Sequence, residues 1–353
     1  MIKRIFLSIA VIFSLFVGYN LFLKRTRILT KELKSSFVDL GGEAKEIRFP
    51  HRFVKATNPG VVKFKEGYLM IFRTKYRSLS DFLIKKMTMR QNNPLGLCRL
   101  NKDLEVVSEP IYMNGSTPAV NINKQSPNDP RLIEHQGRFW AFYNDRVYLD
   151  GVGYVRKMCM CEVFPDHFGI PKILTFPESH TFTEKGKKFH HVEKNWTPFI
   201  YQGGIYMIYL IEPHVILKLD LDTGVCHLVS ESPSGKIWDF GIARGGTPCI
   251  EDKDGYMTFF HSLYPVTGLG HAHNNAYLLG AYWFSGQPPF EIIKRTTKPL
   301  SSPSFYAGFK KIVYPTSLVD EGDHLLLFYG RDDQEIWALR VSKEQLNALG
   351  ECK

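Results

Sequence analysis

A pattern of proline and glycine that recurs five times constrains the fold of this chain more than any other feature. Prolines at positions 59, 130, 198, 248 and 315 are each followed, six to eight residues later, by a glycine and then by a run of apolar and aromatic residues. Such runs are typical of β-strands, and a glycine between two of them is typical of a hairpin turn. The prolines lie 50 to 71 residues apart, which leaves room for about four strands per repeat, the size of a propeller blade. The sequence therefore predicts an all-β fold, a five-bladed β-propeller.

An apolar segment near the N-terminus, residues 5–23, is nearly long enough to cross a bilayer as a helix, which takes roughly 20 apolar residues. Basic residues flank it on both sides, and its end has no small-residue cleavage site. We expect an uncleaved signal anchor, with a cleaved signal peptide as the alternative. The short leading tail favours a single-pass membrane protein whose body lies outside the cytosol, in a lumenal or extracytoplasmic space. The chain would then comprise an anchor and stem, residues 1–35, and one catalytic propeller domain, residues 36–353.

Charge and cysteine usage limit the partners and cofactors of the chain. More than half of the net charge of +10 belongs to the first 35 residues, which favours contact with a membrane and not with nucleic acid. The six cysteines form no CxxC pair, and the histidines at 190, 191, 271 and 273 lack the spacing of a zinc site. No phosphate-binding loop, dinucleotide fingerprint or nucleophile elbow is present. We therefore expect no metal and no cofactor.

Asp129 is the candidate catalytic residue. It precedes Pro130, and a residue before proline is pushed out of the helical conformation, so we expect it in an extended or turn segment. Strand ends at one face of a propeller converge on its axis, so residues far apart in sequence can share one site. Glycosyl transfer needs a carboxylic acid beside the glycosidic oxygen. The alternative is that Asp129 caps a turn or forms a structural ion pair with Arg131.

Basic side chains stand at the ends of the repeated strands and in the loops before them: Arg73, Lys194, Arg244 and His261. Cations that face one pocket suit an anion such as phosphate or a sugar phosphate. Taken singly, each is more often a solvated or ion-paired surface group. Trp140, Trp196 and Tyr329 could stack on sugar rings, and packing in the core is about as common for such residues.

These motifs resemble those of the five-bladed glycoside hydrolase family 130, the β-mannoside phosphorylases and their relatives, over roughly residues 51–341. The resemblance rests on the order of five short motifs: Asn58-Pro59-Gly60, Asn128-Asp129-Pro130-Arg131, Glu193-Lys194-Asn195, Gly245-Gly246-Thr247-Pro248 and Tyr329-Gly330-Arg331-Asp332. The chain departs from the family pattern at Asn128, where the family has Glu, at Arg244, where it has a small residue, and at Ser262, where it has Gly.

The resemblance implies a role for each candidate residue. Asp129 would be the general acid, which protonates through the substrate while phosphate attacks from the opposite face. The phosphate would be bound by Arg156, Lys194 and His261. The sugar would be contacted by Asn58, Arg73 and Asp332. The other substrate-binding candidates are Arg131, Lys194, Asn195 and Arg244.

The predicted function is transfer of a mannosyl-type sugar, with inversion, to or from an oligosaccharide or glycoconjugate. Glycosyltransferase, phosphorylase and hydrolase remain open. An inverting hydrolase needs a second carboxylate to activate water, for which Glu193, Asp239 and Asp332 are candidates. The alternative from another class is a propeller without catalytic activity that binds glycans or proteins, because a fold alone does not determine function.

Overall fold

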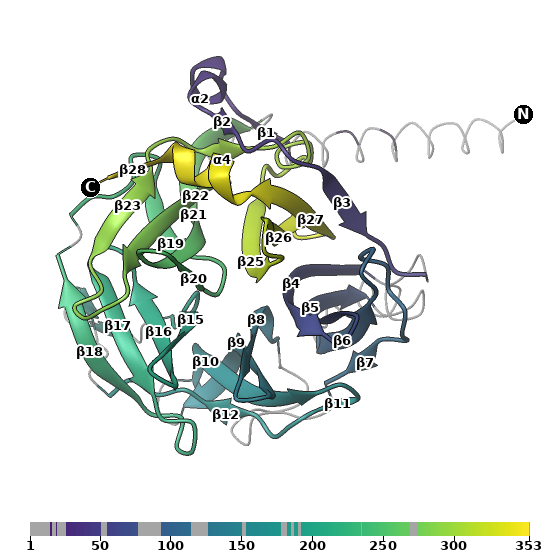
Figure 1. The fold of residues 1–353 in the computed structure, drawn as a ribbon, viewed down its shortest axis with the longest axis vertical. Coiled ribbons are helices and arrows are strands. Elements are labelled where there is room, and N and C mark those ends of the chain that lie inside the picture. The colour runs from purple at the N-terminus through teal and green to yellow at the C-terminus, as the bar shows by residue number, and fades with distance from the viewer. Residues whose placement is uncertain are drawn as a thin grey trace, which may run out of the picture.

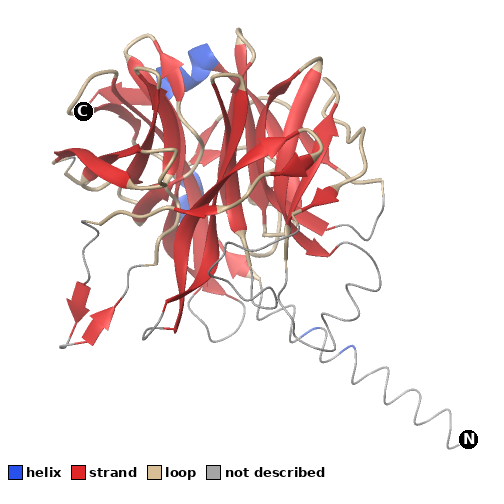
Figure 2. Ribbon diagram, turned by 90° about the horizontal axis from the view of Figure 1, so that it is seen from below, coloured by secondary structure: helices blue, strands red, loops and turns tan. Residues whose placement is uncertain are grey.

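The structure of the protein is a computed structural model. It describes residues 26–50, 55–76, 93–113, 126–149, 153–177, 182–184, 187–189, 192–233, 235–268 and 274–352, together with Leu15 and Tyr19. Strands make up most of these ranges, and short helices α2 (Lys31–Ser35) and α4 (Lys343–Leu349) lie near the two ends of the chain (Figure 2).

Three sheets are built from strands that are consecutive in sequence and pair antiparallel. The first contains β4 (Lys55–Phe64), β5 (Gly67–Tyr76), β6 (Leu95–Leu100) and β7 (Ile111–Tyr112). The second contains β8 (Asn128–His135), β9 (Arg138–Leu149), β10 (Gly153–Phe164), β11 (His167–Phe168) and β12 (Lys172–Ile173). After a separate hairpin of β13 (Phe182–Glu184) and β14 (Lys187–Phe189), the third contains β15 (Thr197–Tyr201), β16 (Gly204–Leu210), β17 (His214–Leu219) and β18 (Cys226–Ser232).

A nine-stranded sheet follows, and it includes strands from both ends of the described chain. Its central hairpin is β21 (Gly255–Gly268) and β22 (Asn274–Ser285), which pair over twelve residues. The others are β1 (Arg27–Ile28), β2 (Val38–Asp39), β19 (Ile242–Gly245), β20 (Ile250–Asp252), β23 (Ile292–Thr296), β24 (Leu300–Ser301) and β28 (Gly350–Cys352).

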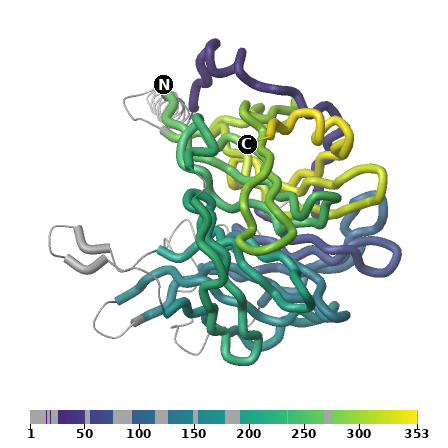
Figure 3. The backbone as a smooth tube through the Cα atoms, turned by 60° about the vertical axis from the view of Figure 1, so that its left-hand side comes forward, coloured from purple at the N-terminus to yellow at the C-terminus, as the bar shows by residue number. Residues whose placement is uncertain are grey.

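The last sheet joins the two ends of the chain. It contains β25 (Val313–Asp320), β26 (His324–Arg331) and β27 (Glu335–Ser342), and its outer strand is β3 (Ala44–Ile47) from near the N-terminus. Ile47 lies opposite Ile336 in this pairing. The purple N-terminal segment and the yellow C-terminal segment therefore run side by side (Figure 3). This pairing closes the ring of sheets.

The sheets are arranged around a central axis, with β4, β8, β15 and β25 closest to it (Figure 1). A cavity of about 250 Å³ on this axis is lined by residues from each part of the ring, including Val61, Leu132, Phe199, Pro248 and Leu318. The predicted all-β propeller is therefore confirmed. The number of five blades stays a prediction.

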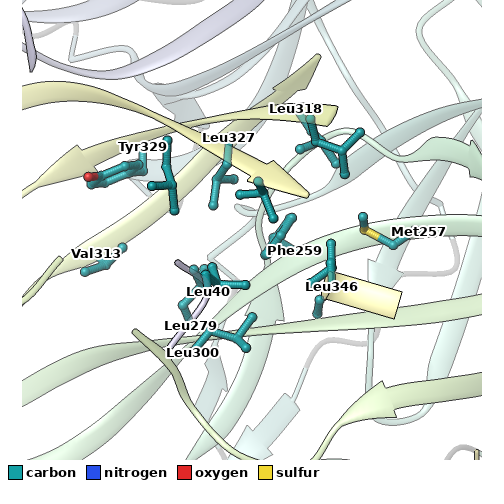
Figure 4. Close-up of a cluster of buried hydrophobic side chains, with 14 of the residues drawn as sticks. Leu40, Met257, Phe259, Leu279, Leu300, Val313, Leu318, Leu327, Tyr329 and Leu346 are labelled. Atoms are coloured by element: carbon teal, nitrogen blue, oxygen red, sulfur yellow. The ribbon is translucent and has the colours of Figure 1, made fainter. Parts of the chain in front are cut away.

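Apolar side chains fill the spaces between neighbouring sheets. The strand β26 carries a continuous buried run from Leu325 to Tyr329, because both of its faces are covered. Figure 4 shows one of these cores, in which Leu327 and Leu318 of the last sheet lie near Phe259 and Leu279 of the nine-stranded sheet. The proline–glycine repeat of the sequence predicted apolar runs of this kind. They are buried because each sheet lies between two others.

The residues before β3 also pack on the propeller. Strand β1 pairs with β21, and Leu29 and Leu33 are buried against Leu278 and its neighbours. The side chain of Thr30 caps α2 by accepting a hydrogen bond from the Leu33 backbone N–H at 3.2 Å. The expected division of the chain at residues 35 and 36 stays a prediction.

The expected membrane localisation is corrected. In the part of the chain that the structure describes, no helix combines the length and the apolar character needed to cross a membrane. This finding overturns the expectation of a single-pass protein with its body in a lumenal or extracytoplasmic space. Of the expected anchor, residues 5–23, all but Leu15 and Tyr19 lie outside the described residues.

Replacing Ile47 with Ala tests the closure of the ring. The Ile47 side chain is buried between sheets, so we expect the free energy of unfolding to fall by about 2–5 kcal/mol in urea titrations. The control is Lys45→Ala on the same strand, at an exposed side chain, which should change it by less than about 0.5 kcal/mol. Equal effects of the two substitutions would contradict a closing role for β3.

Candidate active site

Asp129 lies at a β-bulge and has a left-handed backbone. Its φ is 56°, and the pairing of β8 with β9 shifts register between Asn128 and Arg131. Asp129 lies within the strand β8, in agreement with the extended or turn segment expected before proline, and the bulge imposes a local bend that re-aims its side chain. The Asp129 carboxylate accepts hydrogen bonds from the side-chain amides of Asn58, at 2.7 Å, and Asn144, at 3.4 Å. Its orientation is thus held from two sheets.

Three other candidate residues share this backbone conformation. Asn58, Asn195 and Asp332 have φ values of 52°, 66° and 54°. A left-handed residue other than glycine costs of order 1–3 kcal/mol, and such residues cluster at active sites and ligand clamps. Asn and Asp tolerate the conformation best. The four residues belong to four different sheets or their flanking loops, so this strain recurs around the ring.

Glycine allows two of these segments to approach each other closely. A Cβ atom at Gly330 in β26 would overlap the side-chain oxygen of Asn58 and lie 2.7 Å from the hydroxyl of Thr57. The absence of a side chain at this position therefore lets the last sheet support Asn58, which in turn binds Asp129.

Arg131 joins the second sheet to the nine-stranded sheet. Its side chain is fully buried. It donates hydrogen bonds to the backbone carbonyls of Gly246, Gly245, at 3.0 Å, and Asp129, at 3.2 Å. The guanidinium thereby satisfies carbonyls that water cannot reach. This geometry gives Arg131 a positioning role, and its contact with a substrate stays a prediction.

Two basic side chains, Arg156 and Lys194, share the electrostatic environment of Asp129, and a third, Arg244, acts on Lys194. Arg156 donates a hydrogen bond of 2.7 Å to the Asn144 side chain, and burial lowers its pKa while Asp129 opposes the shift. The pKa of Lys194 is lowered by burial and by the positive charges of Arg244 and Arg156, again against Asp129. Positive charges that lie close together favour a bound anion, because the anion relieves their repulsion. The structure thus brings Arg156 and Lys194 near Asp129, and Arg244 near Lys194.

His261 is a buried neutral group. Its pKa is lowered well below the usual value, first by burial and then by Arg131, Arg244 and Lys194. The ring stacks on Tyr277 at 5.3 Å and contacts Tyr314 at 4.6 Å. The expectation of a cationic His261 is therefore corrected, because burial, reinforced by three neighbouring positive charges, disfavours its protonated form. A neutral imidazole can still donate or accept one hydrogen bond to a ligand.

The remaining sugar-binding candidates are anchored by specific contacts. The Asp332 carboxylate accepts the backbone N–H groups of Lys310, at 2.9 Å, and Ile312, at 3.2 Å. The Asn195 side-chain oxygen accepts a hydrogen bond of 2.6 Å from the Tyr314 hydroxyl. Arg73 lies 3.8 Å from Asp333, the residue after Asp332.

None of the candidates for a second catalytic carboxylate is placed beside Asp129 in the described contacts. Glu193 is buried and accepts a hydrogen bond of 3.1 Å from the indole N–H of Trp196. Asp239 is 79% exposed and pairs with Lys236. The Asp332 carboxylate accepts hydrogen bonds from two backbone N–H groups.

The aromatic candidates for sugar stacking belong to the core. Trp140, Trp196 and Tyr329 are 7%, 1% and 0% exposed. Each of these rings belongs to one of the hydrophobic cores between the sheets, so the core alternative holds for all three.

Sequence reasoning missed several residues of this site, chiefly Asn144, Tyr277, Tyr314 and Asp333. Asn144 directly follows the aromatic run of β9, and it lies opposite Asn128 in the sheet. That pairing follows from the hairpin of the second repeat and could have revealed it. In the described ranges no group of three metal-ligating side chains occurs, and the histidines at 190, 191, 271 and 273 lie outside them.

Comparison with known proteins gives matches that cover very different shares of the chain. No family model matches the chain. It is 22% identical to the β-1,2-mannobiose phosphorylase of Listeria innocua over 82% of this chain and 90% of that protein. It is 25% identical to β-mannosyltransferase 3 of Komagataella phaffii, over 40% of this chain and 25% of that protein. The chain thus matches only a quarter of the yeast protein's length.

Solved structures share the fold. The Listeria innocua phosphorylase bound to β-1,2-mannobiose has a TM-score of 0.56 at 14% identity, over 86% of this chain and 94% of that one. MPT-4, a mannose phosphorylase from Leishmania mexicana bound to phosphate ion, has a TM-score of 0.55 at 11% identity, over 91% and 94%. The chain therefore has the β-propeller fold found in GH130 mannoside phosphorylases.

Replacing Arg131 with Met tests its bridging role. The carbonyls of Gly245 and Gly246 would lose a buried donor, so we expect the free energy of unfolding to fall by about 2–5 kcal/mol in denaturant titrations. Arg138→Met is the matched control, because Arg138 forms an exposed ion pair with Glu162 that should contribute less than about 1 kcal/mol.

The buried carboxylate of Asp145, beside this centre, should make the free energy of unfolding depend on pH. Burial raises its pKa to about 6, although its carboxylate accepts the backbone N–H groups of Ser126 and Arg146. Because the pKa of Asp145 is higher in the folded state than in the unfolded state, the group stabilises the folded protein at pH values below its unfolded-state pKa. This contribution is lost as the pH rises through about 6. Relative to Asp145→Asn, the wild type should lose about 2–3 kcal/mol of unfolding free energy between pH 4 and pH 7. A difference that does not vary with pH would contradict this assignment.

Proposed function

We propose that this protein is an inverting enzyme that cleaves or forms β-mannosides with phosphate as the second substrate. The observation that carries the proposal is the environment of Asp129. Its carboxylate is oriented by Asn58 and Asn144, and its neighbours are the basic side chains of Arg156 and Lys194. A proton donor beside an anion site matches phosphorolysis, whereas hydrolysis needs a second carboxylate.

The proposed reaction has one displacement at the anomeric carbon. A phosphate oxygen forms a bond to this carbon while the glycosidic C–O bond breaks on the opposite face. The bonding electron pair goes to the glycosidic oxygen, which receives the proton of Asp129 directly or through a sugar hydroxyl. Because attack is from the opposite face, a β-mannoside yields α-mannose 1-phosphate and a shortened saccharide. The reverse reaction forms the linkage.

Each remaining candidate has a role in this proposal. Lys194, Arg156 and neutral His261 bind the phosphate, and Arg244 contributes positive charge. The sugar is bound by Asn58, Arg73, Asn195 and Asp332. Positive charges that are fixed before the reaction stabilise developing negative charge without reorganisation. Arg131 positions Asp129 through its backbone carbonyl.

A β-mannosyltransferase is the second candidate, favoured by the match to β-mannosyltransferase 3. The same acid and cations would then act on a different donor. A propeller that only binds glycans is the less favoured alternative, because binding alone would not require a carboxylate that is held by two amides beside basic side chains.

We also infer that the propeller has five blades, forming one domain over residues 36–353. Support comes from the five sheets of four or more strands and from the five inner segments that line the axial cavity.

The test is incubation of the full chain with β-1,2-mannobiose, with and without phosphate. We expect mannose 1-phosphate only when phosphate is present, detected by ³¹P NMR. Asp129→Asn should lower the rate roughly 100- to 10,000-fold, the usual contribution of a general acid, with an unchanged unfolding profile. Asp239→Asn, at an exposed carboxylate, is the matched control and should retain full activity.

Other products identify the other reactions. Mannose released without phosphate would indicate a hydrolase, and transfer from a nucleotide-mannose alone would indicate a transferase. Full activity of Asp129→Asn would refute its role in any of them.

A further inference from the structure

A second cavity, of about 500 Å³, lies between the N-terminal segment and the loop after β24. One wall comes from residues 27–37, which the pairing of β1 with β21 and the burial of Leu33 hold against the propeller. The other wall comes from residues 301–311. Figure 1 shows α2 and β1 at the rim of the ring, beside β21 and β22. No residue that surrounds Asp129 lines this cavity.

The charges of the cavity are all positive. Arg27, Lys34 and Lys311 line it, and no aspartate or glutamate is among its described lining residues. Arg27 donates one hydrogen bond to the Lys310 carbonyl at 2.7 Å, and Lys311 donates one to the Tyr306 carbonyl at 2.8 Å. Because a guanidinium has five N–H donors and an ammonium three, both retain donors for a ligand.

The positive charge of Lys34 acts on Lys311. Burial lowers the pKa of Lys311, the charge of Lys34 lowers it further, and Asp332 opposes the shift. An anion bound between the two ammonium groups would replace this repulsion by two attractions.

The side chains that line the cavity indicate the chemistry of the part of the ligand that is not anionic. The rings of Phe37 and Tyr306 lie 5.1 Å apart, and the serines at 301 and 302 also line the cavity. The cavity volume is within the range of small-ligand sites, roughly 300–1,000 Å³, and exceeds what a phosphate ion alone would fill. An anionic group joined to a body with both apolar and hydroxyl-bearing faces fits these walls.

We propose that this cavity is a second ligand site, separate from the Asp129 centre, which binds a phosphomonoester of about the size of a sugar phosphate. The phosphate lies between Arg27, Lys34 and Lys311, and the body of the ligand lies against Phe37 and Tyr306. This site is independent of the function proposed for Asp129.

Calorimetric titration of the full chain with mannose 6-phosphate tests the proposal. Lys34→Gln should weaken binding at this site about tenfold, the loss expected for one charge-assisted hydrogen bond. Lys31→Gln is the matched control, because Lys31 is exposed on the same helix and outside the cavity lining. It should bind as the wild type does. Lys194→Gln alters the Asp129 centre and should leave the Lys34-dependent binding of mannose 6-phosphate unchanged.

Two results would overturn the proposal. One is unchanged affinity in both Lys34→Gln and a second variant, Lys311→Gln, with unfolding profiles like that of the wild type. The other is inorganic phosphate binding as tightly as mannose 6-phosphate, because the aromatic walls would then contribute nothing. Absence of turnover with β-1,2-mannobiose would instead refute the proposed function and leave this site intact, since the titration does not require catalysis.

Discussion

The inner strands of the propeller lie so close together that their polar groups must satisfy one another. Buried backbone groups without water need protein partners. The Thr316 hydroxyl donates to the Pro59 carbonyl at 2.6 Å, and the Ser317 hydroxyl donates to the Val61 carbonyl and accepts the Val61 N–H. Arg131 does the same for two carbonyls on the other side of the axis. The ring is therefore held at its centre by hydrogen bonds between sheets as well as by apolar cores.

The candidate site depends on the same close approach. Asn58 reaches Asp129 only because it adopts a left-handed conformation against a glycine of the last sheet. Burial that brings the side chains together also changes their protonation, since His261 loses its charge where three cations surround it. Strain and desolvation of this kind are destabilising, and the cores between the sheets offset them.

The features that the sequence predicts are those that repeat. The spacing of Pro59, Pro130 and their counterparts predicted the propeller, and the motif around Asp129 predicted the centre of the site. The four-residue strand β3 carries no strong strand pattern, since it reads Ala-Lys-Glu-Ile, and its pairing with β27 is a property of the closed ring. Likewise, the carbonyl groups that accept hydrogen bonds from Arg131 and the charges that lower the pKa of His261 come from residues distant in sequence. Local patterns contain no information about such partners.

The position of β3 has a consequence for how the chain acquires its shape during synthesis. Ile47 of this strand pairs with Ile336 of β27, so β3 leaves the ribosome well before its partner. Until then β3 is a free edge that can pair with other chains, a recognised route to aggregation. Its lysine and glutamate, Lys45 and Glu46, are residues that discourage such pairing. Their charges protect the nascent protein during the interval before the circle is complete.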